Sequence, residues 1–335
     1  MRRSGEILRG RKAKSQSRTL PEIRIGHASD FRGLTGCTVV LCESGAVCGV
    51  DIRGSAAGTR EIAPCLPGHL VERIHAVFLT GGSAYGLDAA AGVMSYLERR
   101  GVGFAAGRNR IPIVPGAVIF DLDLGSPRAR PTPRMALAAC RAARSAVAEG
   151  SVGAGTGATV GKLYGLFQAT KGGVGYRTLA LPGGVEVHAL VVVNAFGDVI
   201  GPTTGEVIAG ARASRRSTRF VCTAQRMLEG EIRKTVGATN TTLAVVMTNA
   251  GLDKLQAVKV AEMAQDGLAR AISPVHTRYD GDLVFALSVG RKRGDINTLG
   301  TAAAEATARA VVRAVRAART LGGVPSQRDI EKLMA

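Results

Sequence analysis

The sequence contains no tryptophan and few aromatic residues of any kind, since phenylalanine, tyrosine and tryptophan together make up only 4% of its 335 residues. Few rings are therefore available on which nucleic-acid bases could stack. No apolar run approaches the ~18 residues that a membrane-spanning helix needs, so we expect no membrane segment. Charged residues are also sparse, at 21%, whereas hydrophobic residues reach 46% and glycine occurs 44 times. This composition excludes a disordered chain and is typical of an α/β enzyme with a full hydrophobic core.

Cysteines are few and scattered. The six cysteines are Cys37, Cys42, Cys48, Cys65, Cys140 and Cys222. No two of them have the Cys-x-x-Cys spacing and no pair of histidines lies nearby, which argues against a zinc site and against a disulfide framework. The pattern fits a reducing compartment. We therefore expect a cytoplasmic protein that carries no metal and no cofactor.

Acidic residues number 26 against 44 lysines and arginines, which gives a formal net charge of +18. Such an excess suggests nucleic-acid binding as a hypothesis. Part of it, however, lies in residues 1–18, which are polar, lack the apolar segment of a secretory signal and are predicted to be disordered. Another part is a stripe at helical spacing that we interpret as one solvated helix face, namely Arg309, Arg313, Arg316 and Arg319. We expect a basic tail over residues 1–19, a single domain over residues 20–335 and no specific nucleic-acid partner, with at most weak polyanion contacts from the tail.

Strands and helices are predicted throughout residues 20–335. Apolar, β-branched runs predict strands that include residues 37–41, 46–50, 187–193 and 283–289. A turn at residues 43–45 is expected to join the first two of these strands. Helical periodicity predicts helices over residues 87–100, 134–148, 253–272 and 302–321. The third helix opens with a capping box formed by Asp253 and Gln256.

The most informative segment is residues 237–249, where a flexible Gly-Ala-Thr sequence leads into Asn240, Thr241 and an apolar, β-branched run. The run predicts a buried strand that begins at Thr241. An ordinary strand start has the same pattern. The alternative interpretation is that the Asn240–Thr241 bond cleaves itself and leaves Thr241 as a new N-terminus. Its hydroxyl would then attack a substrate while its α-amine serves as the base.

Other segments carry glycines or polar groups that each allow an ordinary structural interpretation. Residues 81–86 form a glycine-rich turn that can bind an anion or simply allow close packing. Residues 153–162 lack the spacing of a Walker A loop and of a dinucleotide fingerprint, so they are either a close crossing of two layers or a glycine run that brings backbone and Lys162 near a ligand. Asn194 ends a predicted strand, as a turn former or as an amide donor to a site. Asp280 and Asp282 point the same way if the chain is extended there, but a solvated turn has the same sequence.

These segments occur together, and in the same order, in the L-aminopeptidase/D-esterase family of peptidases, family S58, which the sequence resembles from about residue 20 to about residue 320. The matching segments are Ile25-Gly26-His27, Asn240-Thr241-Thr242 and residues 81–87, 115–119, 153–162, 171–175, 192–194 and 276–282. Each motif is unspecific alone, whereas the ordered combination is specific. The family includes β-aminopeptidases and the nylon-oligomer 6-aminohexanoate hydrolase.

The resemblance implies an α/β fold, a four-layer αββα sandwich similar to that of N-terminal nucleophile hydrolases. It also implies a precursor that cleaves itself into a large chain, residues 1–240, and a small chain, residues 241–335. Such pairs of chains would assemble as a homo-oligomer, expected to be a tetramer. The implied reaction is the hydrolysis of short peptides, amides or esters that have a free amino end.

The resemblance also assigns roles to single residues. Thr241 would be the nucleophile and Asn194 would donate an amide hydrogen bond to the oxyanion. Asp280 and Asp282 would orient the hydroxyl and the amine of Thr241, and Lys162 would lie close by. The α-amine, whose ordinary pKa is about 8, can accept a proton at neutral pH.

One substrate-binding position departs from the family pattern, because Phe120 stands where several members have tyrosine. A phenolic donor is therefore missing there, and Tyr85 is the neighbour that could replace it. Two other functions also remain open. One is acyl transfer in the manner of ornithine acetyltransferase, which resembles this family in fold and also uses a self-generated threonine nucleophile. The other is an uncleaved binding or scaffold protein that contacts polyanions through its basic tail.

Overall fold

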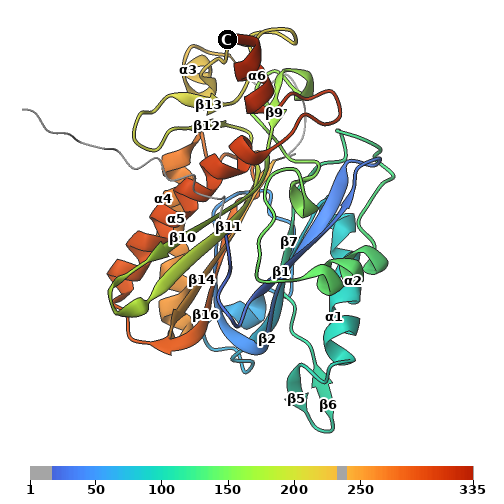
Figure 1. The fold of residues 1–335 in the computed structure, drawn as a ribbon, viewed down its shortest axis with the longest axis vertical. Helices are drawn as coiled ribbons and strands as arrows, with labels where there is room; N and C mark the ends of the chain where they lie inside the picture. The colour runs from blue at the N-terminus through green and yellow to red at the C-terminus, as the bar shows by residue number, and fades with distance from the viewer. Residues whose placement is uncertain (1–16, 232–239, 335) are drawn as a thin grey trace, which may run out of the picture.

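Figure 1 shows the computed structural model of the chain, which describes residues 17–231 and 240–334. Residues 1–16 of the predicted tail and the Gly-Ala-Thr segment before Asn240 lie outside the described residues. Residues 17–19, which the structure describes, belong to the range predicted for the tail. The backbone N–H of Thr19 donates to the carbonyl of Ser145 at 2.9 Å, and the N–H of Val147 donates to the carbonyl of Ser17 at 3.0 Å. The packed part of the chain therefore starts before residue 20.

A sheet of nine strands runs through the described residues. Its strands are β1 (Arg24–Asp30), β2 (Thr35–Ile52), β3 (Thr59–Arg60), β4 (Ile74–Thr80), β7 (Gly116–Val118), β10 (Gly173–Ala180), β11 (Glu186–Asn194), β14 (Thr241–Ala250) and β16 (Leu283–Lys292). Their order is β10-β11-β14-β16-β2-β4-β7-β3, with β1 paired to β2. The β14–β16 and β4–β7 pairs are parallel. The strands predicted at residues 187–193 and 283–289 are therefore confirmed as β11 and β16.

Strand β2 corrects a prediction, because residues 37–41 and 46–50 belong to one strand and not to two strands joined by a turn. The first part of β2 pairs with β4, and its last part pairs with β16. The register shifts between Leu41 and Ala46. Gly45 lies within this shift at a φ of 83°, in the left-handed region that glycine occupies without steric cost. The chain therefore bends there without reversing, and the bend divides the sheet into two halves.

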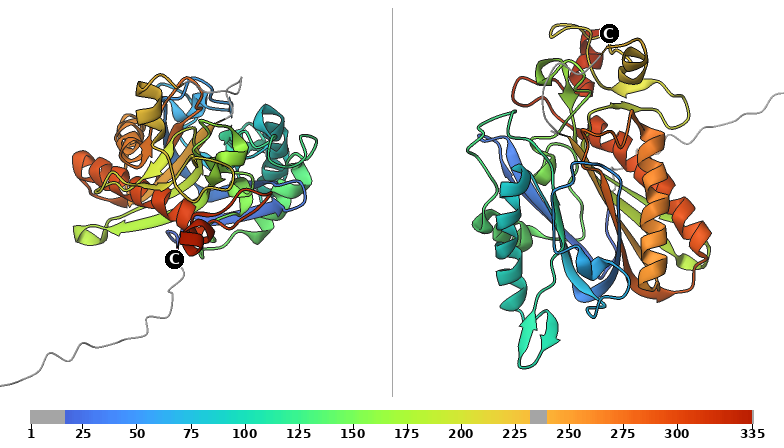
Figure 2. Two further views of the ribbon diagram at one scale, coloured as in Figure 1. Left: turned by 90° about the horizontal axis from the view of Figure 1, so that it is seen from above. Right: turned by 180° about the vertical axis from the view of Figure 1, so that it is seen from behind.

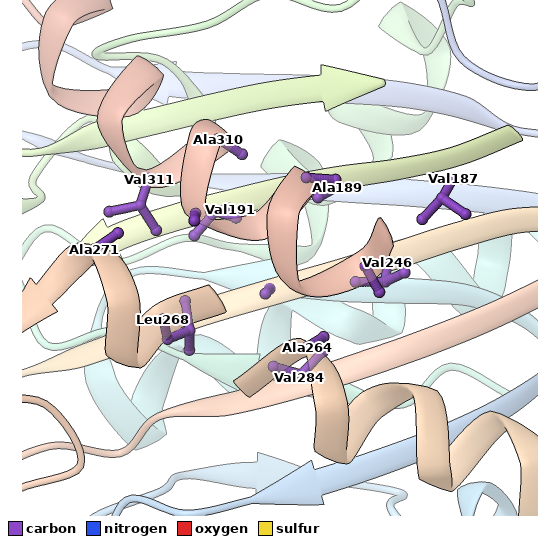
Figure 3. Packing of buried hydrophobic residues seen from close by; sticks show 14 of the residues in the cluster. Val187, Ala189, Val191, Val246, Ala264, Leu268, Ala271, Val284, Ala310 and Val311 are labelled. Atoms are coloured by element: carbon purple, nitrogen blue, oxygen red, sulfur yellow. The ribbon is translucent and has the colours of Figure 1, made fainter. Parts of the chain in front are cut away.

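The two halves of the sheet pack face to face, and a pair of helices covers each outer side (Figure 2). The helices are α1 (Ala90–Glu98) and α2 (Pro133–Ala142) on one side and α4 (Lys254–Ala271) and α5 (Ile296–Ala317) on the other. Alternate residues of β11 face opposite sides, so that Val191 packs under the helices while Val192 packs between the sheet halves. Figure 3 shows Val191 and Val246 beneath α4 and α5. The predicted four-layer αββα sandwich is confirmed.

Helix boundaries follow the local caps and pairings. Helix α4 begins at the predicted capping box of Asp253 and Gln256. Helix α5 begins earlier than predicted, because the side chain of Asp295 accepts a hydrogen bond from the N–H of Thr298 at 2.8 Å and caps it. Helix α2 ends at Ala142, not at residue 148, because the backbone of Arg144 pairs with Ile25 of β1.

Strand glycines let the helices α4 and α5 lie close to the sheet. A Cβ atom on Gly175 of β10 would lie 2.0 Å from the carbonyl oxygen of Ala310 in α5. A Cβ atom on Gly49 of β2 would lie 2.2 Å from the backbone nitrogen of Val258 in α4. Neither position can hold a side chain unless the helix moves away.

The remaining elements are short. They are β5 (Phe104–Ala106), β6 (Asn109–Ile111), β8 (Thr159–Val160), β9 (Thr170–Lys171), β12 (Asp198–Ile200), β13 (Val207–Ala209), β15 (Ile272–Ser273), α3 (Thr223–Leu228) and α6 (Gln327–Met334). Elements β12, β13, α3 and α6 gather beyond one end of the sheet, and the β5–β6 hairpin protrudes at the other end (Figure 1). Within the described ranges, no helix combines the length and the apolar character that crossing a membrane requires.

Candidate active site

Asn194 and Thr241 lie directly opposite one another at the end of two paired strands. Asn194 is the last residue of β11 and Thr241 is the first residue of β14, and the antiparallel register pairs them. Residues that are opposite in such a pair project from the same face of the sheet. Both are buried, with 0% and 4% of their surface exposed. The strand predicted to start at Thr241 is confirmed, and it starts at the end of the sheet where β12, β13 and α3 gather (Figure 1).

The backbone carbonyl of Asn240 accepts two hydrogen bonds. The hydroxyl of Thr241 donates to this oxygen at 2.5 Å, and the N–H of Gly281 donates to it at 3.0 Å. Asn240 is itself buried and forms a parallel bridge with Asp280. The hydroxyl of Thr241 therefore lies against the peptide bond that precedes it. The N–H of Gly281 lies where it would stabilise the negative charge that forms on the oxygen if that hydroxyl attacked the carbonyl carbon.

The carboxylates of Asp280 and Asp282 accept hydrogen bonds around this bond. Asp282 accepts from the N–H of Thr242 at 2.6 Å, and from the N–H and Nδ1 of His276 at 3.1 and 3.0 Å. Asp280 accepts from the N–H of Phe196 at 3.0 Å and from the hydroxyl of Thr277 at 2.5 Å. The two aspartates that the sequence singled out therefore hold different parts of the site, Asp282 the backbone of Thr242 and Asp280 that of Phe196, just beyond the end of β11. In the part of the chain that the structure describes, no group of three or more His, Cys, Asp or Glu side chains could hold a metal ion.

The acidity of Asp280 is shifted by its surroundings. Burial raises its pKa to about 6, and the nearby charge of Asp282 acts in the same direction. The hydrogen bonds from Thr277 and Phe196 and the charge of Lys162 act against this rise. Since a buried carboxylate that carries a like-charged neighbour holds its proton more tightly, Asp280 changes its charge just below neutral pH.

Asn194 and Lys162 form one polar unit beside Thr241. The ammonium of Lys162 donates to the side-chain oxygen of Asn194 at 2.7 Å and to its backbone oxygen at 3.1 Å. That side-chain oxygen also accepts from the N–H of Thr159 at 3.1 Å. The amide nitrogen of Asn194 donates to the carbonyl of Phe120 at 3.0 Å, which uses one of its two hydrogens. The predicted amide donor is therefore firmly oriented, and a cation lies next to it.

The two predicted substrate-binding residues lie at different depths. Phe120 is half-buried and contacts the site through its backbone carbonyl, which receives the amide of Asn194. Tyr85 is 56% exposed, and the guanidinium of Arg130 lies 3.5 Å from the centre of its ring. Within the described residues, no hydrogen bond links Tyr85 to Thr241, Asn194 or the two aspartates. The structure thus places Phe120 against the site and Tyr85 on the surface.

Sequence reasoning assigned no role to several groups that complete the site. They are His276 and Thr277, which belong to the matching segment of residues 276–282, and the backbone N–H groups of Phe196 and Gly281. His276 adopts a φ of 53°, which a residue with a bulky side chain rarely adopts and which often marks a functional site. A sequence carries no signal for a backbone N–H that is aimed by the fold, so Gly281 and Phe196 could not be found in that way.

Comparison with known proteins gives one consistent picture. The model of peptidase family S58 matches residues 19–328. An uncharacterized aminopeptidase of Mycobacterium leprae (strain TN) is 42% identical over 314 residues, which cover 87% of this chain and 85% of the relative. A 6-aminohexanoate-oligomer endohydrolase of Agromyces sp. (strain KY5R) is 31% identical over 295 residues, which cover 84% of this chain and 79% of that enzyme.

A solved structure agrees with the fold. The L-aminopeptidase D-Ala-esterase/amidase from Ochrobactrum anthropi, described as a new variant among the Ntn hydrolase fold, matches with a TM-score of 0.70. The match covers 94% of this chain and 91% of that one at 18% sequence identity. At this identity, the likeness shows a shared fold.

Proposed function

The chain belongs to peptidase family S58 and is a hydrolase of the aminopeptidase and amidase class, and from this premise we propose that it activates itself by cutting the Asn240–Thr241 bond. Thr241 then acts as an N-terminal nucleophile on short peptides, amides or esters that have a free amino end. The oligomer hydrolase among its relatives supports an amide substrate of this kind. The processed form consists of a large chain, residues 1–240, and a small chain, residues 241–335, and such pairs assemble into a homo-oligomer, expected to be a tetramer.

The observation that carries this proposal is the pair of hydrogen bonds on the Asn240 carbonyl. The hydroxyl of Thr241 is 2.5 Å from this oxygen, and the N–H of Gly281 is 3.0 Å from it. Attack of the hydroxyl oxygen on the carbonyl carbon forms a five-membered ring, and the negative charge that develops is stabilised by Gly281. Breakage of the C–N bond then moves the acyl group from nitrogen to oxygen and turns the amide into an ester.

Water completes the cleavage. It hydrolyses the ester, which leaves a carboxylate on Asn240 and a free α-amine on Thr241. The amine then lies beside the hydroxyl of the same residue and can take its proton, because its ordinary pKa of about 8 is near neutral. The hydroxyl oxygen attacks the substrate carbonyl to give an acyl-enzyme, which a second water hydrolyses.

The surrounding polar groups supply position and charge in both reactions. Asp282 fixes the backbone of Thr242, and Asp280 fixes that of Phe196. Asn194 lies opposite Thr241 on the neighbouring strand and binds Lys162, so the two add an oriented amide and a positive charge near the developing oxyanion. One set of groups therefore serves self-cleavage first and substrate hydrolysis afterwards.

Intact-mass analysis of the purified protein tests the proposal directly. The wild type should show a small chain that begins at Thr241, whereas Thr241→Ala should stay full length and lack activity. Thr241→Ser should retain part of both functions, because it keeps a hydroxyl at the same position. Thr242→Ala is the matched control, since its buried hydroxyl has no partner among the described residues, and it should still be cleaved. A single full-length mass in an active preparation would falsify the mechanism.

A further inference from the structure

A cavity of about 530 Å³ on the outer surface is lined by four arginines. They are Arg177, Arg309, Arg313 and Arg316. Helix α5 and strand β10 form one wall of the cavity, and the loop of residues 201–206 after β12 forms another. Its volume lies in the range of roughly 300–1,000 Å³ that is typical of small-molecule sites. Three arginines of the stripe that the sequence suggested to be a solvated helix face, Arg309, Arg313 and Arg316, thus border this cavity, and none of the predicted site residues lines it.

Carboxylates neutralise only part of this positive charge. The Nε atom of Arg313 donates to both oxygens of Glu149 at 3.0 Å, so these two side chains form an ion pair. The Nε atom of Arg309 donates to Glu305 at 2.6 Å. Glu305 is shared, however, because Arg270 also donates to it, at 2.8 Å. Arg313 therefore has a carboxylate of its own among the arginines of the cavity, whereas Arg309 shares one with Arg270.

The other two arginines are not paired with carboxylates. Within the described residues, Arg177 donates only to the backbone carbonyl of Tyr176, at 3.2 Å, and Arg316 forms no ion pair. Glu206 also lines the cavity, but no ion pair joins it to either of them. The pKa of Arg177 is lowered, first by burial and then by the repulsion of the three arginines on α5, against the attraction of Glu149. Like charges that converge in this way repel one another until an anion lies between them.

We propose that this cavity binds a small polyanion that contains a phosphoanhydride chain, either inorganic or as part of a nucleotide. Planar guanidinium groups match phosphate oxygens and can bind them with two parallel hydrogen bonds. Thr203 and Thr204 also line the cavity, in the loop after β12, and their side chains carry hydroxyls that can act as neutral donors. A chain of phosphates offers more acceptor oxygens and more negative charge than a single carboxylate, so it can engage Arg177 and Arg316 together.

Calorimetric titration of the full-length protein with sodium triphosphate, at constant ionic strength, tests this site without any turnover. We expect saturable binding at one site per chain. Arg177→Gln and Arg316→Gln should each weaken it about tenfold, which corresponds to about 1.4 kcal/mol. Arg110→Gln is the matched control, because it removes the same charge from an exposed strand far from the cavity and should change the affinity little. A nucleoside triphosphate run in parallel shows whether the phosphates alone are recognised, in which case it binds as tightly as triphosphate, or whether a nucleoside adds affinity.

Three results would overturn the proposal. The first is the absence of saturable binding. The second is an equal loss of affinity in Arg110→Gln, which would show that only net charge matters. The third is a combined result: the wild type does not bind triphosphate, and the Arg177 and Arg316 variants change their oligomeric state. This result would assign the arginines to an interface with a second copy of the chain. Thermal unfolding of each variant confirms that a loss of binding does not reflect a loss of fold.

Discussion

At the scale of single residues, the side chain of Asp282 accepts from the N–H of Thr242, next to the Asn240–Thr241 bond, and that of Asp280 accepts from the N–H of Phe196, just beyond the end of β11. We expect Asp280→Asn and Asp282→Asn each to slow self-cleavage and turnover at least about tenfold, because an amide group places a donor where an acceptor is needed. The conversion of precursor and the hydrolysis of aminoacyl p-nitroanilides measure the two rates. Asp266→Asn, on the exposed face of α4, should leave both unchanged. Wild-type rates in both site variants would reduce the pair to a structural turn.

The pKa of Asp280 predicts how activity depends on pH. Burial raises this pKa to about 6, so the group is ionised at neutral pH and becomes protonated as the pH falls through about 6. A protonated carboxyl has lost its negative charge and carries an O–H donor at one oxygen, so kcat/KM should fall about tenfold for each pH unit below that point.

A control for this pH dependence comes from the neighbouring charge. The charge of Asp282 helps to raise the pKa of Asp280. In Asp282→Asn, the residual activity should therefore begin to fall at a lower pH than the activity of the wild type does. A profile of the wild type that is flat from about pH 5 to about pH 8 would contradict the assignment of Asp280 to the reaction.

At the scale of elements, the close contact between β10 and α5 makes Gly175 sensitive to substitution. Gly175→Ala should lower the free energy of unfolding by about 1–3 kcal/mol, because its methyl group would overlap the carbonyl of Ala310 and force the helix outward. Urea unfolding measures the loss. Gly251→Ala is the matched control, since its nearest neighbour would be 3.4 Å away, and it should be nearly neutral. Equal stability of the two variants would show that the helix shifts without cost.

The N-terminal segment gives a second prediction at this scale. A chain that starts at Ser17 should fold, cleave and turn over like the full chain, because residues 1–16 are polar and without apolar periodicity. A chain that starts at Pro21 should lose stability, since it lacks the pairing of residues 17–19 with residues 145–147 and the buried Leu20. Thermal unfolding and intact-mass analysis of both truncations give the comparison. Misfolding of the Ser17 chain would show that the tail has a structural role.

At the scale of the whole molecule, the sequence was enough to predict the layers but not the path of the chain between them. Hydrophobic periodicity and ordered motifs are local, and they placed β11, β14 and α4 close to their observed bounds. The sequence predicts a turn at residues 43–45 where β2 only bends, because Gly45 suits both and only the pairing with β4 and β16 decides between them.

The candidate site shows the same limit. Side chains that carry chemistry could be named from the sequence, but their relations depend on contacts between distant segments. Asn194 meets Thr241 only through the strand register, and the N–H of Gly281 reaches the Asn240 carbonyl only because Asn240 and Asp280 form a bridge. Such pairings are set by tertiary packing, so neither local propensity nor motif spacing contains them.

The order of the strands has a consequence for the life of the protein after cleavage. In the nine-stranded sheet, β14 lies next to β11 and β16 lies next to β2, so the two strands that the small chain contributes to this sheet are held between two large-chain strands. In the processed form that we propose, the pieces would stay together without a covalent link. Folding of the precursor is a first-order process, whereas two separated pieces would have to find each other at a rate that depends on their concentration. The active protein would therefore keep a fold that formed while the chain was intact. If the cleaved protein were unfolded in dilute solution, it would refold slowly or not at all.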